Sequence, residues 1–318
     1  MTIDFARPGK SIQPITVETE AGPLDAGNIC ILNNGEGPRV LLVAGIHGDE
    51  YEAQLALHAL VARLEADDVR GRLIVIPEAN FPASSNGTRT APSDGANMNR
   101  TFPGDAAGTP TERLSAFLFD TVLPQADLLI DVHSGGPTYK GEAIAFAFHS
   151  PACKVAEADV VRMMEAFGLP YITYQDGIDT TYVGAAAKAG TAAIELEGAG
   201  TTLVEAHAAE TFADALLRGL VHYGSLRGAA PASGTAPRHL DVRPENMFEA
   251  EVEGLLEHRV RMGDTVEAGD LVAVIHPFGA FGTAPHRVEA KAGGIVISQR
   301  SLLRVVPGDC LGNTGTPR

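Results

Sequence analysis

Short, nearly continuous apolar runs alternate with helical segments through most of the chain, and this alternation restricts the fold more than any other feature. The first run, Arg39–Ile46, is bounded by glycines, as is typical of a strand buried on both faces. Similar runs follow at Arg72–Pro77, Ala126–Val132, Ala143–Phe148 and Thr191–Leu196. Glu52–Glu65 and Val155–Phe167 carry apolar residues at helical spacing. We therefore expect an α/β fold with a mixed, largely parallel sheet and helices on both faces.

The pattern changes after Gly228–Pro237, a stretch of small residues and prolines with the composition of a linker. Beyond it the apolar runs are short, β-like and separated by glycines. They lie at Gly254–Val260, Asp270–His276 and Gly294–Ser298. We expect one large domain over residues 1–230 and a small all-β domain over residues 238–318.

The phrase VRMGDTVEAG, at Val260–Gly269, resembles the half-barrel of lipoyl and biotinyl carrier domains. The resemblance implies a barrel-sandwich fold for the small domain. Carriers place a modified lysine at a tight hairpin, whereas the corresponding tip here is Gly279–Ala284, and Lys291 comes later. We therefore expect a structural barrel without a prosthetic group.

Charge and cysteine content argue against several classes of protein. The chain has 40 acidic and 24 basic residues, and its net charge of -16 would repel nucleic acid and anionic membrane surfaces. The widely spaced Cys30, Cys153 and Cys310 suggest neither a disulfide framework nor a cysteine-rich zinc site. No apolar stretch has the length of a signal peptide or a membrane span. We expect a cytoplasmic protein with a small-molecule partner; a homo-oligomer is compatible with the sequence.

Two strand ends finish in residues that bind metals. The turn Gly45–Glu50 (GIHGDE) sets His47 and Glu50 three residues apart, and His133 ends another apolar run in DVHSGG. A parallel sheet would bring these ends together, and two imidazoles with one carboxylate suit a catalytic zinc ion that keeps a position for water. An isolated histidine is usually a surface or packing residue, but the combination favours one zinc ion per chain. Asp131 has the strand spacing to orient His133.

A long segment rich in Gly, Pro, Ser and Asn, Asn80–Gly104, runs between these strands and contains Arg89 and Arg100. A loop of this length is usually functional or disordered. An arginine there suits a site that holds a carboxylate or a developing oxyanion, because its planar guanidinium donates two parallel hydrogen bonds.

Together these motifs resemble the succinylglutamate desuccinylase and aspartoacylase family, which is related to zinc carboxypeptidases. The GxHGxE and DxHxG phrases imply that His47, Glu50 and His133 are the zinc ligands. The pair Thr88-Arg89 and the later phrase Asn97-Met98-Asn99-Arg100 match the family's TR and N-L-N-R.

The resemblance also implies roles for the residues around the metal. Arg89 would stabilise the oxyanion, and Asn99 and Arg100 would hold the substrate's carboxylate. The catalytic glutamate would be Glu195, in AIELEG. The phrases HGDEYE, TRT, NxNRxFPG and DxHSGG, with the carboxyl-terminal half-barrel, are most similar to N-acetyl-diaminobutyrate deacetylases of ectoine breakdown.

Two departures from the family pattern concern the substrate. Aspartoacylases carry an arginine before the catalytic glutamate, whereas Tyr182–Ala189 has alanines, including Ala185, and only Lys188 nearby. An acylated dicarboxylic amino acid is therefore disfavoured. The second departure is Glu197, an acidic residue that stands where the family's glutamate phrase has a glycine. It is either a solvent-facing residue on a loop or a contact for a cationic group of the substrate.

The expected reaction is zinc-dependent hydrolysis of the amide bond of a small N-acyl amino acid, such as N-acetyl-2,4-diaminobutyrate. A metal-bound water would attack, with Glu195 as general base. One alternative is a metallocarboxypeptidase that acts on peptides, because it shares the metal and arginine chemistry. Another is a non-catalytic metal-binding or carrier-like module.

Overall fold

The structure is a computed structural model that describes residues 3–174, 178–200, 203–205, 207–233 and 236–318. Gly234 and Thr235, within the predicted linker, lie outside the described residues.

Four parallel strands form the centre of the main sheet, in the order β4-β3-β5-β9. Their bounds are Gly71–Ile76, Arg39–Ala44, Leu128–Ser134 and Ala192–Gly198. Each corresponds to an apolar run of the sequence, because strands covered on both faces need apolar side chains at nearly every position. The parallel order brings the carboxyl ends of β3, β5 and β9 to one edge.

Antiparallel and outer strands extend this centre on both sides. A hairpin of β1 (Gly9–Thr19) and β2 (Gly22–Asn34) pairs with β4 on one side. On the other side β7 (Ile144–Phe148) runs antiparallel to β9 and is followed by β8 (Tyr171–Tyr174) and β10 (Arg238–Asp241). The sheet is therefore mixed, as expected.

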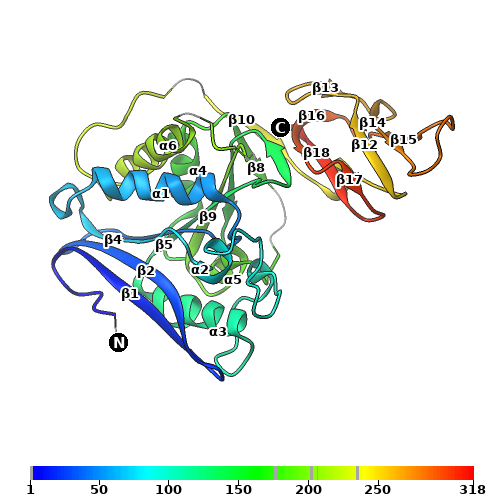
Figure 1. Ribbon diagram of the computed structural model, residues 1–318. Coiled ribbons are helices and arrows are strands. Elements are labelled where there is room, and N and C mark those ends of the chain that lie inside the picture. Colours follow the sequence, from blue (N-terminus) through cyan, green and yellow to red (C-terminus); the bar gives the residue numbers. More distant parts are fainter. Residues whose placement is uncertain (1–2, 175–177, 201–202, 206, 234–235) are drawn as a thin grey trace.

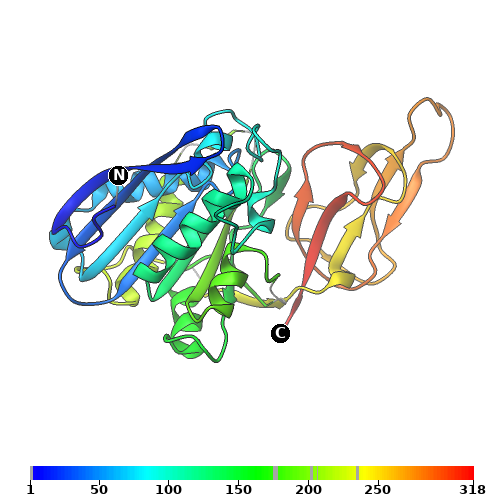
Figure 2. The same cartoon turned by 90° about the horizontal axis from the view of Figure 1, so that it is seen from below.

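Helices cover both faces of the main sheet (Figures 1 and 2). One face packs against α1 (Tyr51–Arg63), α4 (Glu157–Phe167) and α6 (Ala208–His222). The other packs against α3 (Pro110–Phe117) and α5 (Tyr182–Lys188). Leu42 of β3 belongs to the first core and its neighbour Leu41 to the second, as alternate strand residues must. The predicted helices correspond to α1 and α4.

The carboxyl-terminal strands form a separate lobe in Figures 1 and 2. The remaining strands are β11 (Met247–Glu249), β12 (Gly254–His258), β13 (Thr265–Val266), β14 (Leu271–His276), β15 (His286–Glu289), β16 (Gly294–Arg300), β17 (Arg304–Val305) and β18 (Cys310–Pro317). Hydrogen bonds join this lobe to the main sheet at two places, since β18 pairs with β10 and β16 pairs with β6 (Tyr139–Gly141). The segment that follows His133 is thus an edge strand of the lobe.

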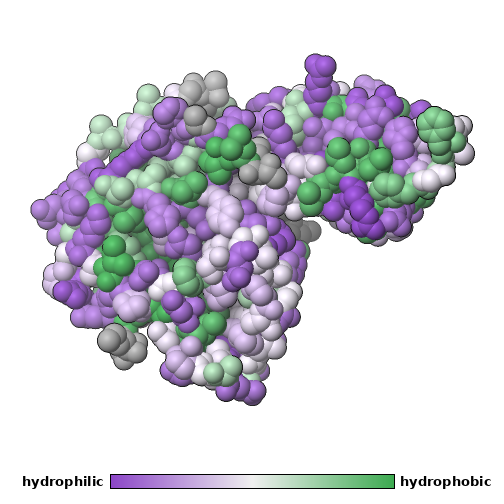
Figure 3. Space-filling model, in the orientation of Figure 1, coloured by the Kyte–Doolittle hydropathy of each residue, from purple (hydrophilic) through white to green (hydrophobic). Residues whose placement is uncertain are grey.

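The surface seen in Figure 3 is largely hydrophilic, with apolar areas on both parts of the molecule. Exposed apolar side chains of the lobe include Leu255, Leu302 and Leu303. Among the described residues, no helix combines the length and the apolar character needed to cross a membrane.

Candidate active site

The three predicted metal ligands meet at the carboxyl ends of β3 and β5. Glu50 lies between two imidazoles: Oε1 is 2.8 Å from His47 Nδ1, and Oε2 is 2.8 Å from His133 Nδ1. One ligand atom of each residue lies within 4.8 Å of the others, and all three side chains are buried. Burial alone would raise the pKa of Glu50, but His47 and His133 hold it well below its ordinary value. The site therefore presents two imidazoles and an ionised carboxylate to one point.

The metal-binding turn is packed tightly against the long loop. A Cβ atom on Gly48 would lie 2.3 Å from the carbonyl carbon of Ala83, in α2 (Phe81–Ser84), so a larger residue does not fit there. The Gly48 N–H also donates a hydrogen bond to Arg89 O, at 3.2 Å. This packing holds the backbone of Arg89 beside the ligands.

Asp131 lies on the same face of β5 as His133, as expected. Its Oδ2 is 3.1 Å from His133 Nε2, and the Asp131 side chain is fully buried. A carboxylate beside Nε2 favours a proton on that nitrogen, which leaves Nδ1 for a metal. His133 Nδ1 is the atom that faces Glu50.

Asn97 contacts the candidate site, although the sequence patterns gave it no role of its own. Its Oδ1 lies 3.1 Å from His47 Nε2 and also accepts a hydrogen bond from the Asn99 N–H, at 3.0 Å. Asn97 thereby begins the short 3₁₀ turn η2 (Met98–Arg100). The preference of asparagine for the position before a helical turn was the available signal.

A cavity of about 290 Å³ lies over the ligands. The predicted site residues that line it are His47, Glu50, Arg89, Asn99, Arg100, His133, Glu195 and Glu197. Arg89 Nη1 donates to Glu50 Oε1 at 3.0 Å. Asn99 Oδ1 accepts a hydrogen bond from the Tyr182 N–H at the start of α5, also at 3.0 Å, which fixes the side chain of Asn99. The fold therefore brings every predicted site residue to one cavity.

Glu195 lies beside Asp131 in the register of β9 and β5. Ligand atoms of Asp131, His133 and Glu195 lie within 4.8 Å of one another. Burial raises the pKa of Glu195 to about 7, and the negative charges of Asp131 and Glu50 add to this effect. A carboxyl group with a pKa near neutrality can both accept and return a proton.

Glu197 belongs to β9 and lies beside His133 in the register, so its interpretation as a loop residue is wrong. It lines the cavity over the ligands and also a second cavity. Burial raises the pKa of Glu197 well above its ordinary value, and the charge of Glu50 adds to this. Its side chain is partly exposed to the cavity, and no hydrogen bond joins its carboxylate to another described residue.

The stretch that lacks the aspartoacylase arginine forms α5. Ala185 is buried there, and Lys188 is exposed and pairs with Asp179 at 2.7 Å. Lys188 is not among the residues that line the cavity. Neither residue can replace the arginine that would bind a second substrate carboxylate.

Comparisons with known proteins agree with this geometry. Residues 36–223 match the succinylglutamate desuccinylase/aspartoacylase catalytic domain. Over 290 residues the chain is 35% identical to N-alpha-acetyl-L-2,4-diaminobutyric acid deacetylase of Halomonas elongata. The aligned region covers 89% of this chain and 83% of that protein.

Solved structures are similar over almost the whole chain. The product-bound ectoine utilization protein EutE (DoeB) of Ruegeria pomeroyi is 33% identical, with a TM-score of 0.89 and coverage of 99% of this chain and 98% of that one. A succinylglutamate desuccinylase/aspartoacylase of Rhodobacter sphaeroides is 30% identical, with a TM-score of 0.90 and coverage of 100% and 99%. The chain belongs to the succinylglutamate desuccinylase/aspartoacylase family.

Proposed function

We propose that this protein is a zinc-dependent deacylase that hydrolyses the amide bond of small N-acyl amino acids, with N-acetyl-2,4-diaminobutyrate as the preferred candidate. The observation that carries this proposal is the meeting of His47, Glu50 and His133 in the cavity that Arg89 and Glu195 also line. The relative from Halomonas elongata, named as a deacetylase of the acetylated diamino acid, supports the choice of substrate.

The residues present fit a zinc ion. Two imidazole nitrogens and one carboxylate are a known ligand set of catalytic zinc sites, and these three ligands come from buried side chains. When bound, zinc acts as a Lewis acid and lowers the pKa of water to about 7. Asn97 would hold the His47 imidazole in orientation through its contact with His47 Nε2, and Asp131 would do the same for His133 through His133 Nε2.

The side chains around the ligands have separate tasks in this mechanism. Glu195 accepts the proton of the attacking water and returns it to the leaving nitrogen, since an amide anion is a very poor leaving group. Arg89 donates hydrogen bonds to the oxyanion that forms at the acyl carbonyl, a contribution of roughly 3 to 4 kcal/mol for one donor. Asn99 and Arg100 bind the substrate carboxylate and thereby position the scissile bond.

Glu197 is the residue that favours a diamino acid over acyl-aspartate. Its carboxyl group lines the cavity, partly exposed and without a hydrogen-bond partner among the described residues, so it is free to contact a substrate. An ammonium group of the substrate would supply that partner. A second substrate carboxylate would instead be repelled.

The test is an assay of zinc-loaded protein with N-acetylated diamino, basic and acidic amino acids and with a short peptide. We expect hydrolysis of N-acetyl-2,4-diaminobutyrate, with little hydrolysis of N-acetylaspartate. Glu197→Gln should weaken the cationic substrate more than an uncharged one. Hydrolysis of the peptide alone would establish the metallocarboxypeptidase alternative, and bound zinc without hydrolysis of any acyl amide would establish the non-catalytic module.

Expectations about the domains, the location and the assembly complete the proposal. The large domain would comprise residues 1–230 and the small one residues 238–318, with a barrel-sandwich fold. No lysine occurs at the tip Gly279–Ala284, which supports a structural rather than a carrier role. A cytoplasmic location and assembly into a homo-oligomer stay predictions.

A further inference from the structure

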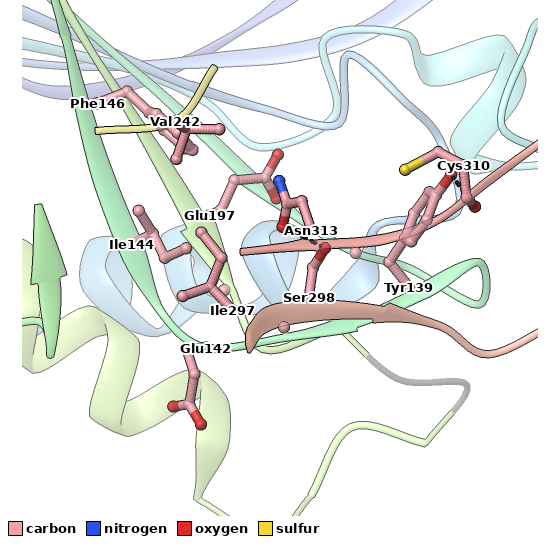
Figure 4. Close-up of a pocket in the computed structure, with 13 residues that line it drawn as sticks. Tyr139, Glu142, Ile144, Phe146, Glu197, Val242, Ile297, Ser298, Cys310 and Asn313 are labelled. Atoms are coloured by element: carbon pink, nitrogen blue, oxygen red, sulfur yellow. Dashed lines mark hydrogen bonds between the residues drawn. The ribbon is translucent and has the colours of Figure 1, made fainter. Parts of the chain in front are cut away.

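A second cavity, of about 240 Å³, adjoins the first, and Gly135, Tyr139 and Glu197 line both. One wall is formed by β7 and β9, through Ile144, Phe146 and Glu197, and by Val242 after β10. The opposite wall is formed by Ile297, Ser298, Cys310 and Asn313 of the carboxyl-terminal strands (Figure 4). The cavity thus lies between the main sheet and the lobe.

The polar groups of this cavity gather around the Glu197 carboxylate. Figure 4 shows the amide nitrogen of Asn313 turned toward Glu197 and its oxygen turned toward Ser298, while Glu142 points away. The Ser298 hydroxyl donates to Asn313 Oδ1 at 2.7 Å. The Glu197 carboxylate, the Ser298 hydroxyl oxygen and the second lone pair of Asn313 Oδ1 can each accept a hydrogen bond from an ammonium group, which has three donors.

The apolar parts of these two walls are suited to methylene groups. Ile144, Val242 and Ile297 contribute aliphatic side chains to the same cavity. A short aliphatic chain that ends in an ammonium group therefore meets an apolar wall along its length and acceptors at its end.

Hydrogen bonds hold the two walls in register. Ser298 pairs with Gly141 and Arg300 with Tyr139 in the ladder between β16 and β6. The Tyr139 hydroxyl also donates to Cys310 O at 3.3 Å. β6 follows His133 closely in the chain. The pairing of β16 with β6 therefore fixes the position of the lobe near the predicted metal ligands.

We infer that this second cavity is the subsite for the ammonium-bearing side chain of the substrate, and that Asn313 and Ser298 of the carboxyl-terminal strands determine specificity together with Glu197. The inference rests on the proposed deacylase function and gives the lobe a part in substrate selection. The ligand class is an amino acid whose side chain carries an ammonium group, separated from the α-carbon by about two methylene groups.

The test compares two substrates that differ in charge but hardly in shape, Nα-acetyl-2,4-diaminobutyrate and N-acetylnorvaline. We expect Asn313→Leu to lower the ratio of their kcat/KM values about ten-fold, the size expected for one lost hydrogen bond to a charged group. Ser298→Ala should lower the ratio less, about three-fold. The matched control Ser301→Ala changes an exposed serine outside the cavity and should leave the ratio unchanged.

Calorimetric binding of 2,4-diaminobutyrate and norvaline gives a readout that does not depend on turnover. Asn313→Leu should weaken binding of the diamino acid selectively, and circular dichroism should show the fold of each variant to be intact. Equal losses for both substrates and both amino acids, in Asn313→Leu and in Ser298→Ala, would overturn the subsite. If the wild-type protein hydrolyses neither substrate, the proposed function fails. The calorimetric measurement still tests the subsite: a selective loss of diamino-acid binding in Asn313→Leu supports it, and an equal loss for both amino acids contradicts it.

Discussion

His47 Nε2 and Asn97 Oδ1 lie 3.1 Å apart, so the amide of the long loop orients the imidazole of a predicted metal ligand. The same oxygen accepts the hydrogen bond of the Asn99 N–H. One side chain therefore links His47 to the turn that carries Asn99 and Arg100. A mutation at Asn97 should disturb both the metal site and the carboxylate-binding site.

We predict that Asn97→Ala lowers zinc affinity about 10- to 100-fold, the usual effect of losing a partner that orients a ligating histidine. KM should rise as well, because the turn at Asn99 loses its first hydrogen bond. Competition with a chromogenic chelator measures the affinity. Asn86→Ala, which changes an exposed asparagine of the same loop, is the control and should retain zinc as the wild type does.

Glu195→Gln should reduce kcat by roughly 10²- to 10⁴-fold, the contribution typical of a general base. Zinc content should stay at one equivalent, because Glu195 is not one of the three ligands. Metal analysis beside steady-state kinetics separates the two effects, and Glu245→Gln, at an exposed position, controls for the loss of a carboxylate. Normal turnover in Glu195→Gln would refute the assignment of the base.

Gly200→Ala should destabilise the site more than the strain of a left-handed backbone alone explains. Gly200 has φ +65°, and a Cβ atom there would lie 2.3 Å from Gly135 N, two residues after His133. Gly224 has φ +81° with nothing within 4 Å of the added Cβ, so Gly224→Ala pays only the backbone cost of about 1 to 2 kcal/mol.

Urea unfolding and zinc content measure the difference between these two alanine variants. We expect Gly200→Ala to lose more free energy of unfolding than Gly224→Ala and to bind zinc more weakly. Equal stability of the two variants would show that the loop after β9 yields without disturbing Gly135.

The central strands could be predicted because their surroundings impose a simple pattern. Arg39–Ile46 was expected and β3 spans Arg39–Ala44, since a strand covered on both faces must be apolar throughout. The hairpin β1-β2 was not predicted. β1 alternates roughly between buried and exposed residues, whereas β2 has a continuous buried run at Ile29–Leu32, and the place of the hairpin depends on the pairing of β2 with β4.

The clustering of His47, Glu50 and His133 could be predicted because their residue types and strand-end positions are local features of the chain. Asn97 could not, since its contact with His47 joins residues 50 positions apart through the path of a long loop. The same holds for the second cavity. Its walls come from β7 and β9 and from strands near the carboxyl terminus, and the pairings of β6 with β16 and of β10 with β18 bring them together.

The ion pair of Arg39 and Asp127 joins the starts of β3 and β5, the two strands that end at the metal ligands. Arg39 Nε donates to Asp127 Oδ2 at 3.0 Å, and the Asp127 N–H donates to Arg39 O at 2.8 Å. The hydrogen bond from Arg39 holds the pKa of Asp127 below its ordinary value, despite the opposing effect of burial. Asp127 therefore stabilises the fold above its unfolded pKa of about 3.9, and this contribution disappears as the pH falls through the lower folded value.

We predict that Asp127→Asn lowers the free energy of unfolding by about 1 kcal/mol at pH 7, a modest figure because both side chains are partly exposed and screened by solvent. The difference from the wild type should shrink as the pH falls below about 3.9 and should vanish only once the pH is below the lowered folded pKa, where the aspartate is protonated in both states. Urea unfolding of metal-free protein between pH 3 and pH 8 measures it without a contribution from zinc release. Asp120→Asn, at an exposed position, is the control, and a difference that stays constant with pH would show that the Asp127 charge does not stabilise the fold.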